Sequence, residues 1–264
     1  MKRFRGLIIL LIILGIYGLV LFFTFGNKDN NSSGNTNNNT VNNKTDNKTE
    51  YLVIGNTSNL KYNNGVFTKS GKYEIERLDS LKVYVNNKYY GDYKLKSGEN
   101  WNLFDNKDEF VNYNGSLIAF SNTFNVKVRS NYKVREINEK DKVFLINDYN
   151  ISSFSNLTTN EVIDIDLDNN GVNDEIICIS SLDDSIDVKN YFSLVIIVLN
   201  EEKITLIEEK EDKAIHIYSV YGILNIDNND HDSIILTQTE GYISEKPIVS
   251  NLIYNYKNDK YMID

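Results

Sequence analysis

The sequence has one cysteine, one proline and only two histidines among its 264 residues. A single cysteine, Cys178, cannot form an intramolecular disulfide, so a small disulfide-stapled secreted domain is excluded. Cys178 lies in the run EIICIS, which predicts a buried hydrophobic side chain rather than a reactive thiol. The scarcity of proline, together with abundant Asn, Lys, Ile and Tyr, whose codons are rich in A and T, indicates an AT-rich bacterial source.

The common catalytic motifs are also missing. Neither G-x-S-x-G nor H-E-x-x-H occurs. His216 lies in the strand-like run AIHIYS, which predicts a satisfied sheet residue, and His231 lies among acidic residues. Adjacent carboxylates at 183–184 and 208–209 could serve a glycosidase, but such pairs are typical of solvated turns and strand ends. The sequence therefore predicts a protein that is not an enzyme.

Positive charge is scarce beyond the N-terminus. The chain has 28 basic and 37 acidic side chains, and three of the basic ones are Lys2, Arg3 and Arg5. Without these three, residues 6–264 carry 25 basic and 37 acidic side chains, a net charge of −12. Such a field repels nucleic acid and concentrates cations, so nucleic-acid binding is not expected.

One long apolar run follows the N-terminal cations, from Leu7 to Phe25. As a helix it spans roughly 28 Å, close to the thickness of a hydrocarbon core. A signal peptide is the alternative, but its apolar region is usually about 7–15 residues long and ends at a small-residue cleavage site, which FFTFGNKDN lacks. The sequence predicts a single-pass transmembrane signal anchor at 7–25 in the cell membrane, with residues 1–6 as a basic cytoplasmic tail and the C-terminal domain extracellular.

Residues 27–50 form an Asn-rich stretch whose only apolar side chain is Val41. Nothing there offsets the entropy of ordering the backbone, so a disordered linker is predicted. From Tyr51 onward apolar residues alternate with period two, which predicts antiparallel β-structure and no amphipathic helix. The 18 tyrosines and 12 phenylalanines are expected mostly to form cross-strand pairs that stabilise the sheets, and the sole tryptophan, Trp101, is the first aromatic residue to consider for stacking on a carbohydrate.

Asn-Gly and Asn-Asn pairs between alternating runs predict tight hairpin turns, because these residues tolerate positive φ. Turns are expected at 64–65, 86–87 and 114–115, and two later hairpins within 193–209 and 250–263. The first strand, YLVI, is expected to pair with the last, KYMID, and close the structure.

The stretch VIDIDLDNNGVNDEIICIS, residues 162–180, interrupts two strand-like runs with Asp, Asn and Gly. Counted from Asp166, oxygen-bearing groups fall at the odd positions of a tight calcium loop, and Gly171 at position six permits the sharp turn. The predicted ligands of this first loop are Asp166, Asp168, Asn170, the Val172 carbonyl and Asp174. Without a cation, the three clustered carboxylates would repel one another, so a Ca²⁺ site is predicted.

An EF-hand would supply a glutamate on a helix at position twelve, where this chain has Ile177 in a strand. The pattern D-x-D-x-N-G-x-x-D-E-I-I resembles instead the calcium loops of the FG-GAP and VCBS repeat families of integrin-like β-propellers. The resemblance covers about residues 160–264. It implies that the loop joins two strands of one propeller blade and that positions 166, 168, 170, 172 and 174 bind the ion.

A second, less regular copy follows in ILNIDNNDHDSIILTQT. Its predicted ligands are Asn225, Asp227, Asn229, His231 and Asp232. Asn replaces the first Asp, Asp230 replaces the glycine, and the final carboxylate comes one residue early. Either copy could instead be a solvated turn that binds no ion.

These features predict a mainly β protein with a β-rich region at 51–150 and two tandem calcium-loop blades at 151–264. The blades belong either to a small or incomplete propeller or to a β-domain followed by a blade pair. The predicted function is binding, adhesion or structural display at a bacterial cell surface, with an extracellular protein or glycan as partner. A surface hydrolase of cell-wall or extracellular polymer is one alternative. An accessory subunit of a membrane complex is another, although Gly15 and Gly18 form no GxxxG face.

Overall fold

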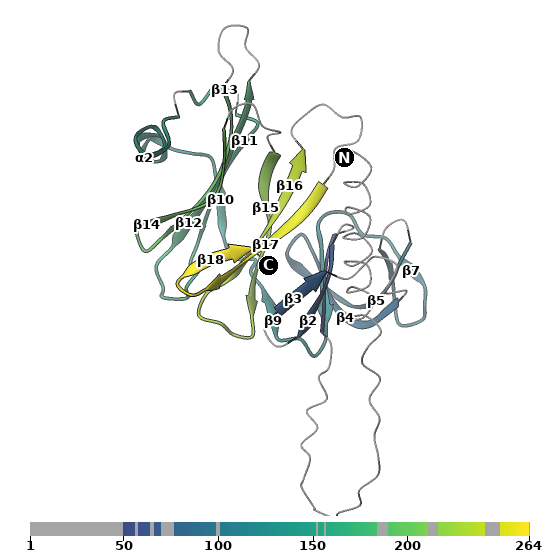
Figure 1. Cartoon of the computed structure of the whole chain (residues 1–264). Helices are drawn as coiled ribbons and strands as arrows, with labels where there is room; N and C mark the ends of the chain where they lie inside the picture. Colours follow the sequence, from purple (N-terminus) through teal and green to yellow (C-terminus); the bar gives the residue numbers. More distant parts are fainter. Residues whose placement is uncertain are drawn as a thin grey trace, which may run out of the picture. The chain divides into compact units, whose positions relative to one another are not determined.

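The computed structural model in Figure 1 describes most of the chain from Glu50 onward. The described residues are 50–55, 58–63, 66–69, 77–98, 101–151, 153–155, 157–183, 190–210, 216–240 and 249–263. They form antiparallel β-sheets and one α-helix, which confirms the predicted mainly β class. The predicted anchor at 7–25 and all of the linker at 27–50 except Glu50 lie outside them. Within the described ranges, no helix has the length and apolar character needed to cross a membrane.

The first sheet has eight strands in the order β3-β2-β1-β8-β4-β5-β6-β7. The strands are β1 (Glu50–Ile54), β2 (Ser58–Asn63), β3 (Val66–Lys69), β4 (Arg77–Val85), β5 (Lys88–Lys96), β6 (Asn102–Phe104), β7 (Phe110–Val111) and β8 (Leu117–Ser121).

The second and third sheets repeat one design (Figure 1). Each is a four-stranded meander with one further strand, contributed by an earlier segment, beside its first strand. The second sheet contains β10 (Lys133–Arg135), β11 (Thr159–Ile165), β12 (Asp174–Asp183), β13 (Asn190–Leu199) and β14 (Glu202–Lys210). The third contains β9 (Val126–Val128), β15 (His216–Ile226), β16 (Ser233–Glu240), β17 (Val249–Lys257) and β18 (Lys260–Ile263).

The three sheets pack through apolar side chains that alternate along the strands, as period-two patterns require. Ile176 of β12 belongs to a core cluster with Ile234 of the third sheet, whereas its neighbour Ile177 belongs to a cluster with the helix. In the third sheet, the neighbours Ile234 and Ile235 also belong to different clusters, and Ile235 packs in a cluster with Ile118 of the first sheet. The third sheet is therefore apolar on both faces.

The predicted turns are confirmed wherever a two-residue hairpin forms. Asn86 and Asn87 have φ of 52° and 59° between β4 and β5. The 200–201 and 258–259 turns also have two residues with positive φ, and they join β13 to β14 and β17 to β18. Residues 64–65 lie outside the described residues, although β2 and β3 pair as expected.

Two predicted strand pairings are wrong. The segment at 114–115 does not close a hairpin, because β7 pairs with β6 while β8 pairs with β1 and β4. Instead, the Asn86 side chain contacts this segment and accepts a hydrogen bond from the Ser116 N–H at 3.0 Å. The first and last strands do not pair either, because β1 lies between β2 and β8 while β18 pairs with β17.

The prediction of no helix after the anchor is also wrong, because α2 spans Glu139–Tyr149. Its start is fixed by a capping box in which Asn138 accepts from the Asp141 N–H at 3.1 Å and Asp141 accepts from the Asn138 N–H at 2.8 Å. Its buried positions are Asp141, Leu145 and Tyr149. Only two of the three are apolar, so the sequence carries a weak helical pattern.

Candidate metal centre

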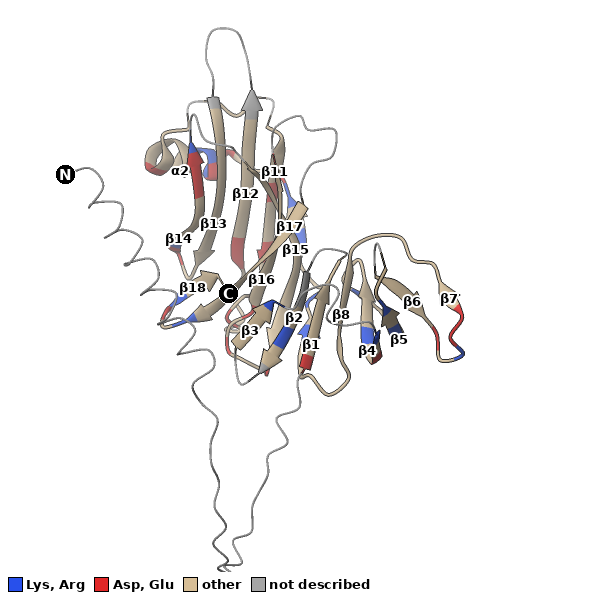
Figure 2. Ribbon diagram, turned by 45° about the vertical axis from the view of Figure 1, so that its right-hand side comes forward, with Lys and Arg blue, Asp and Glu red and all other residues tan. Residues whose placement is uncertain are grey.

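The first loop, residues 166–173, connects β11 to β12 at one end of the second sheet. Ile165 and Asp174 are register partners, so the two strands fix both ends of the loop. Asn169 has φ of 57° and Gly171 has φ of 88°, which confirms the predicted sharp turn at the glycine. Figure 2 shows acidic residues where β12 begins.

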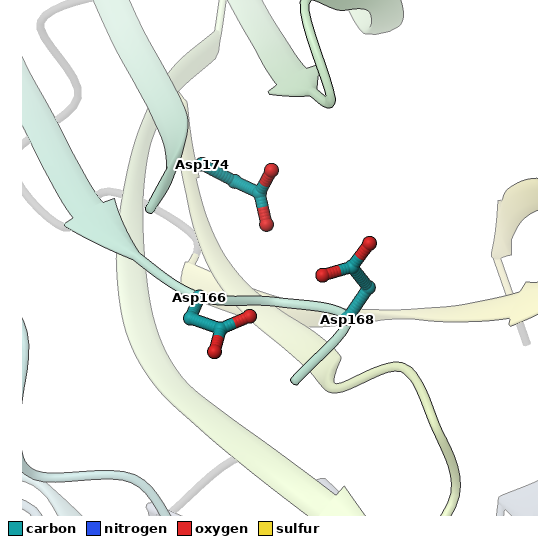
Figure 3. A group of neighbouring side chains, drawn as sticks. All are labelled: Asp166, Asp168 and Asp174. Carbon is teal, nitrogen blue, oxygen red and sulfur yellow. The ribbon is translucent and has the colours of Figure 1, made fainter. Parts of the chain in front are cut away.

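The three aspartates of the first loop converge. Asp166, Asp168 and Asp174 each offer a carboxylate oxygen, and these oxygens lie within 4.8 Å of one another. Figure 3 shows the Asp168 and Asp174 carboxylates pointing toward each other from opposite sides of the loop, with Asp166 beside them. Among the described residues, these three form the one group of at least three acidic, His or Cys side chains placed to hold a metal.

Backbone N–H groups hold all three carboxylates in place, and Asp168 accepts from Asn170 at 3.2 Å. Asp166 accepts from Asn170 at 3.0 Å and from Gly171 at 2.9 Å. Asp174, at only 3% exposure, accepts from Leu167 at 2.9 Å and from the backbone of Asn200 at 3.1 Å. Burial raises the pKa of Asp174 above its ordinary value despite these bonds, because it penalises the charged form.

Asp168 is electrostatically different from Asp174. Partial burial acts to raise its pKa, but hydrogen bonds from the Asn200 side chain and the Asn170 backbone lower it below its ordinary value. Asp168 therefore carries negative charge more readily than Asp174 does. Carboxylate oxygens are ligands of hard divalent cations.

The other two predicted ligands of the first loop are the Asn170 side chain and the Val172 backbone carbonyl. The amide oxygen of Asn170 accepts from the Val172 N–H at 2.7 Å, and its amide nitrogen donates to Asp168 at 3.0 Å. Val172 is 62% exposed, and the ligand predicted there is its backbone carbonyl rather than its apolar side chain. The three aspartates thus converge through carboxylate oxygens, and Asn170 contacts them through its amide nitrogen rather than its oxygen.

Two residues at the site were missed by sequence reasoning. Asn200, in the β13–β14 turn, donates from its side chain to Asp168 at 2.7 Å. Tyr261 of β18 is 6% exposed, and its hydroxyl has no hydrogen-bond partner among the described residues. Burial first, and then the charges of Asp232, Asp174 and Asp168, raise the pKa of Tyr261. No local motif marks either residue.

Of the predicted ligands of the second loop, Asp227 and His231 have partners elsewhere, whereas Asn225, Asn229 and Asp232 are joined to one another by hydrogen bonds. Asp227 accepts from the Tyr62 hydroxyl, and the His231 ring stacks on Tyr256 with centroids 3.7 Å apart. Asn225 donates to the Asn229 carbonyl at 2.7 Å and to Asp232 at 2.9 Å. Positive φ occurs at Asp227 and Asn228, which places this turn earlier than in the first loop.

The remaining residues singled out by the sequence are structural. Trp101 is 2% exposed, so its ring does not lie open to a carbohydrate. Cys178 is fully buried, and burial raises the pKa of its thiol, as its apolar flanks predicted. His216 is satisfied by Glu209, whose carboxylate lies 3.0 Å from its Nδ1.

No protein-family model matches the sequence, and comparisons with curated proteins and with solved structures likewise give no match. The FG-GAP and VCBS resemblance therefore remains a prediction that rests on the loop residues.

Proposed function

We propose that the chain is a calcium-stabilised extracellular β module, held at the cell membrane by residues 7–25 and displayed on the linker at 27–50. Its role is binding to an extracellular protein or glycan, adhesion or structural display. The convergence of three carboxylates within 4.8 Å is the observation that carries the calcium assignment.

The buried Tyr261 hydroxyl supports a bound ion independently of the carboxylates. A buried hydroxyl without a partner is unfavourable by about 1–3 kcal/mol. Among the described residues Tyr261 has no such partner, and burial first, then the charges of Asp232 and Asp174, raise the pKa of its hydroxyl. A hydrated Ca²⁺ at the first loop, whose bound water molecules donate hydrogen bonds, would give this hydroxyl oxygen a partner.

The two meanders support membership of the FG-GAP or VCBS type. In each, an acidic loop follows the first strand, after Ile165 in β11 and after Ile226 in β15. The eight-stranded first sheet has a different topology from these meanders, which favours a β-domain followed by a blade pair over a propeller of equal blades.

Calcium titration of the full-length chain tests the proposal. Extracellular modules commonly bind Ca²⁺ with dissociation constants of about 10⁻⁴–10⁻³ M. Ca²⁺ at about 10⁻² M then adds roughly 1.4–2.7 kcal/mol of stability, or about 3–10 °C in Tm for a domain of this size. Asp168→Ala should abolish this shift, because it removes one of the three carboxylates that converge on the site.

Asp79→Ala is the matched control. Asp79 is an exposed acidic residue of β4 in the first sheet, so its loss changes net charge equally while leaving the loop intact. A wild-type Tm unchanged by Ca²⁺, or an equal shift in wild type and Asp168→Ala, would refute the calcium assignment.

A further inference from the structure

Arg129, which directly follows β9, places its guanidinium group between the two loops. Its Nη1 donates to the Asn169 side chain and its Nη2 to the Asp166 carbonyl, each at 2.9 Å. Its Nε lies 3.2 Å from Asp232 Oδ2, at ion-pair distance but outside hydrogen-bond geometry. The Arg129 backbone is itself fixed, because its N–H donates to the Ile223 carbonyl of β15 at 2.9 Å.

The second loop already has N–H donors where a metal would bind. Asp232 is fully buried, with one carboxylate oxygen beside Arg129 and the other accepting from the Asn225 amide at 2.9 Å. The same amide serves the Asn229 carbonyl at 2.7 Å. Two of the five predicted ligands of this loop, Asn229 and Asp232, therefore face an amide or a guanidinium group, and a third, Asn225, supplies that amide.

The first loop differs in this respect. Within the described part of the chain, no lysine or arginine forms an ion pair with the side chain of Asp166, Asp168 or Asp174. Arg129 reaches the first loop only through the Asp166 carbonyl and the Asn169 side chain. The second loop thus has an arginine as the counter-charge of its buried carboxylate, whereas the first-loop carboxylates have no such partner among the described residues.

We propose that the Arg129 guanidinium is the built-in cation of the second loop, so that the chain binds one Ca²⁺, at the first loop, and the second loop accepts an ion only when Arg129 is removed. The single Ca²⁺ at the first loop rests on the proposed function, whereas the role of Arg129 at the second loop does not. A buried carboxylate needs a counter-charge, and a guanidinium and a Ca²⁺ ion at one carboxylate repel each other.

The number of bound ions tests this inference by isothermal titration calorimetry with Ca²⁺ on full-length variants. Wild type should bind one ion and Arg129→Met two. Asp168→Ala should bind none, and the double variant Asp168→Ala, Arg129→Met should bind one. Adding Asp232→Asn to Arg129→Met should return the count to one, because the buried carboxylate is the ligand that Arg129 releases.

Lys127→Met is the matched control, because Lys127 is an exposed cation of β9 two residues away, and its loss should leave one ion bound. A folded Arg129→Met that still binds one ion would overturn the inference, as would a wild type that binds two ions and loses one with Asp232→Asn. A wild type with none and an Arg129→Met variant with one would refute the first-loop assignment but support the role of Arg129.

Arg129→Met removes the counter-charge of the buried Asp232, so folding is followed by circular dichroism during the titration. Refolding driven by Ca²⁺ would support the inference, because the ion then replaces the guanidinium. An unfolded state that persists in about 20 mM Ca²⁺, well above extracellular dissociation constants of about 10⁻⁴–10⁻³ M, would count against it. Arg129→Lys keeps a cation at this position and should keep the count at one.

Discussion

The backbone N–H of Asp232 donates a hydrogen bond to the carbonyl oxygen of Leu167 at 2.8 Å, which joins the second loop directly to the first. The Asn169 side chain adds a second link by donating to the Asp230 carbonyl at 3.1 Å. Because residues in direct contact do not respond independently to substitution, changes in one loop should alter the other.

Gly171→Ala should destabilise the first loop through its backbone alone. Gly171 has φ of 88°, and a Cβ added there would meet nothing within 4 Å, so space is available but the conformation is unfavourable for alanine. We expect a loss of about 1–2 kcal/mol in the free energy of unfolding, measured by urea denaturation. Gly171→Asn should lose less, because asparagine tolerates positive φ. Equal losses in the two variants would contradict a backbone cause.

Arg135→Met should be strongly destabilising, because Arg135 ties the start of α2 to the second sheet. Its guanidinium pairs with Asp141, with Asp164 at 3.2 Å and with Glu175 at 2.8 Å. Asp141 is 1% exposed and would be left as a buried charge, at a cost of about 3–5 kcal/mol. Chemical denaturation measures the loss.

Arg77→Met is the control for this prediction, because Arg77 also pairs with carboxylates but lies at the surface. Its removal should leave the denaturation midpoint unchanged, since exposed ion pairs contribute little. A comparable loss in both variants would show that burial of Asp141 is not the cause.

Features set by neighbouring residues were predictable from the sequence. The Asn86-Asn87 turn depends on two residues that tolerate positive φ, and the three aspartates converge because one short loop carries them all. The burial of Cys178 follows from its isoleucine neighbours. Each of these depends on contacts within a few residues, which is the range over which sequence patterns carry information.

Features that depend on distant segments were not predictable. Arg129 and Asn200 reach the loops from the segment after β9 and from the β13–β14 turn, and no spacing rule connects them to Asp166. The helix α2 was missed for a related reason. Its buried Asp141 satisfies a capping box and an ion pair rather than a hydrophobic stripe, so the helical period is weak.

Glu161→Gln should stabilise the protein at neutral pH. Burial raises the pKa of Glu161 above its ordinary value of 4.5, and a 3.4 Å hydrogen bond from the Val220 N–H only partly opposes this. A carboxyl with a raised folded-state pKa destabilises the fold when it is ionised, and this penalty disappears as the pH falls through that pKa. The difference in Tm between variant and wild type should therefore be positive at neutral pH and shrink towards pH 4.5.

Glu109→Gln, on an exposed side chain, separates this effect from a general change in net charge. A stabilisation by Glu161→Gln that is the same at neutral pH and near pH 4.5 would rule out ionisation of Glu161 as its source.

Leu145→Ala should reveal how firmly α2 is docked on the second sheet. Leu145 is fully buried in a cluster with Ile177 and Ile196, whereas the adjacent Ile146 is 50% exposed. Truncating a buried leucine costs about 2–5 kcal/mol through lost burial and the cavity left behind, and urea denaturation measures it. Ile146→Ala removes a side chain of similar size from the same helix and should cost far less. If the two variants were equally stable, α2 would not be packed on β12 and β13, and the buried Asp141–Arg135 pair would have to be exposed with it.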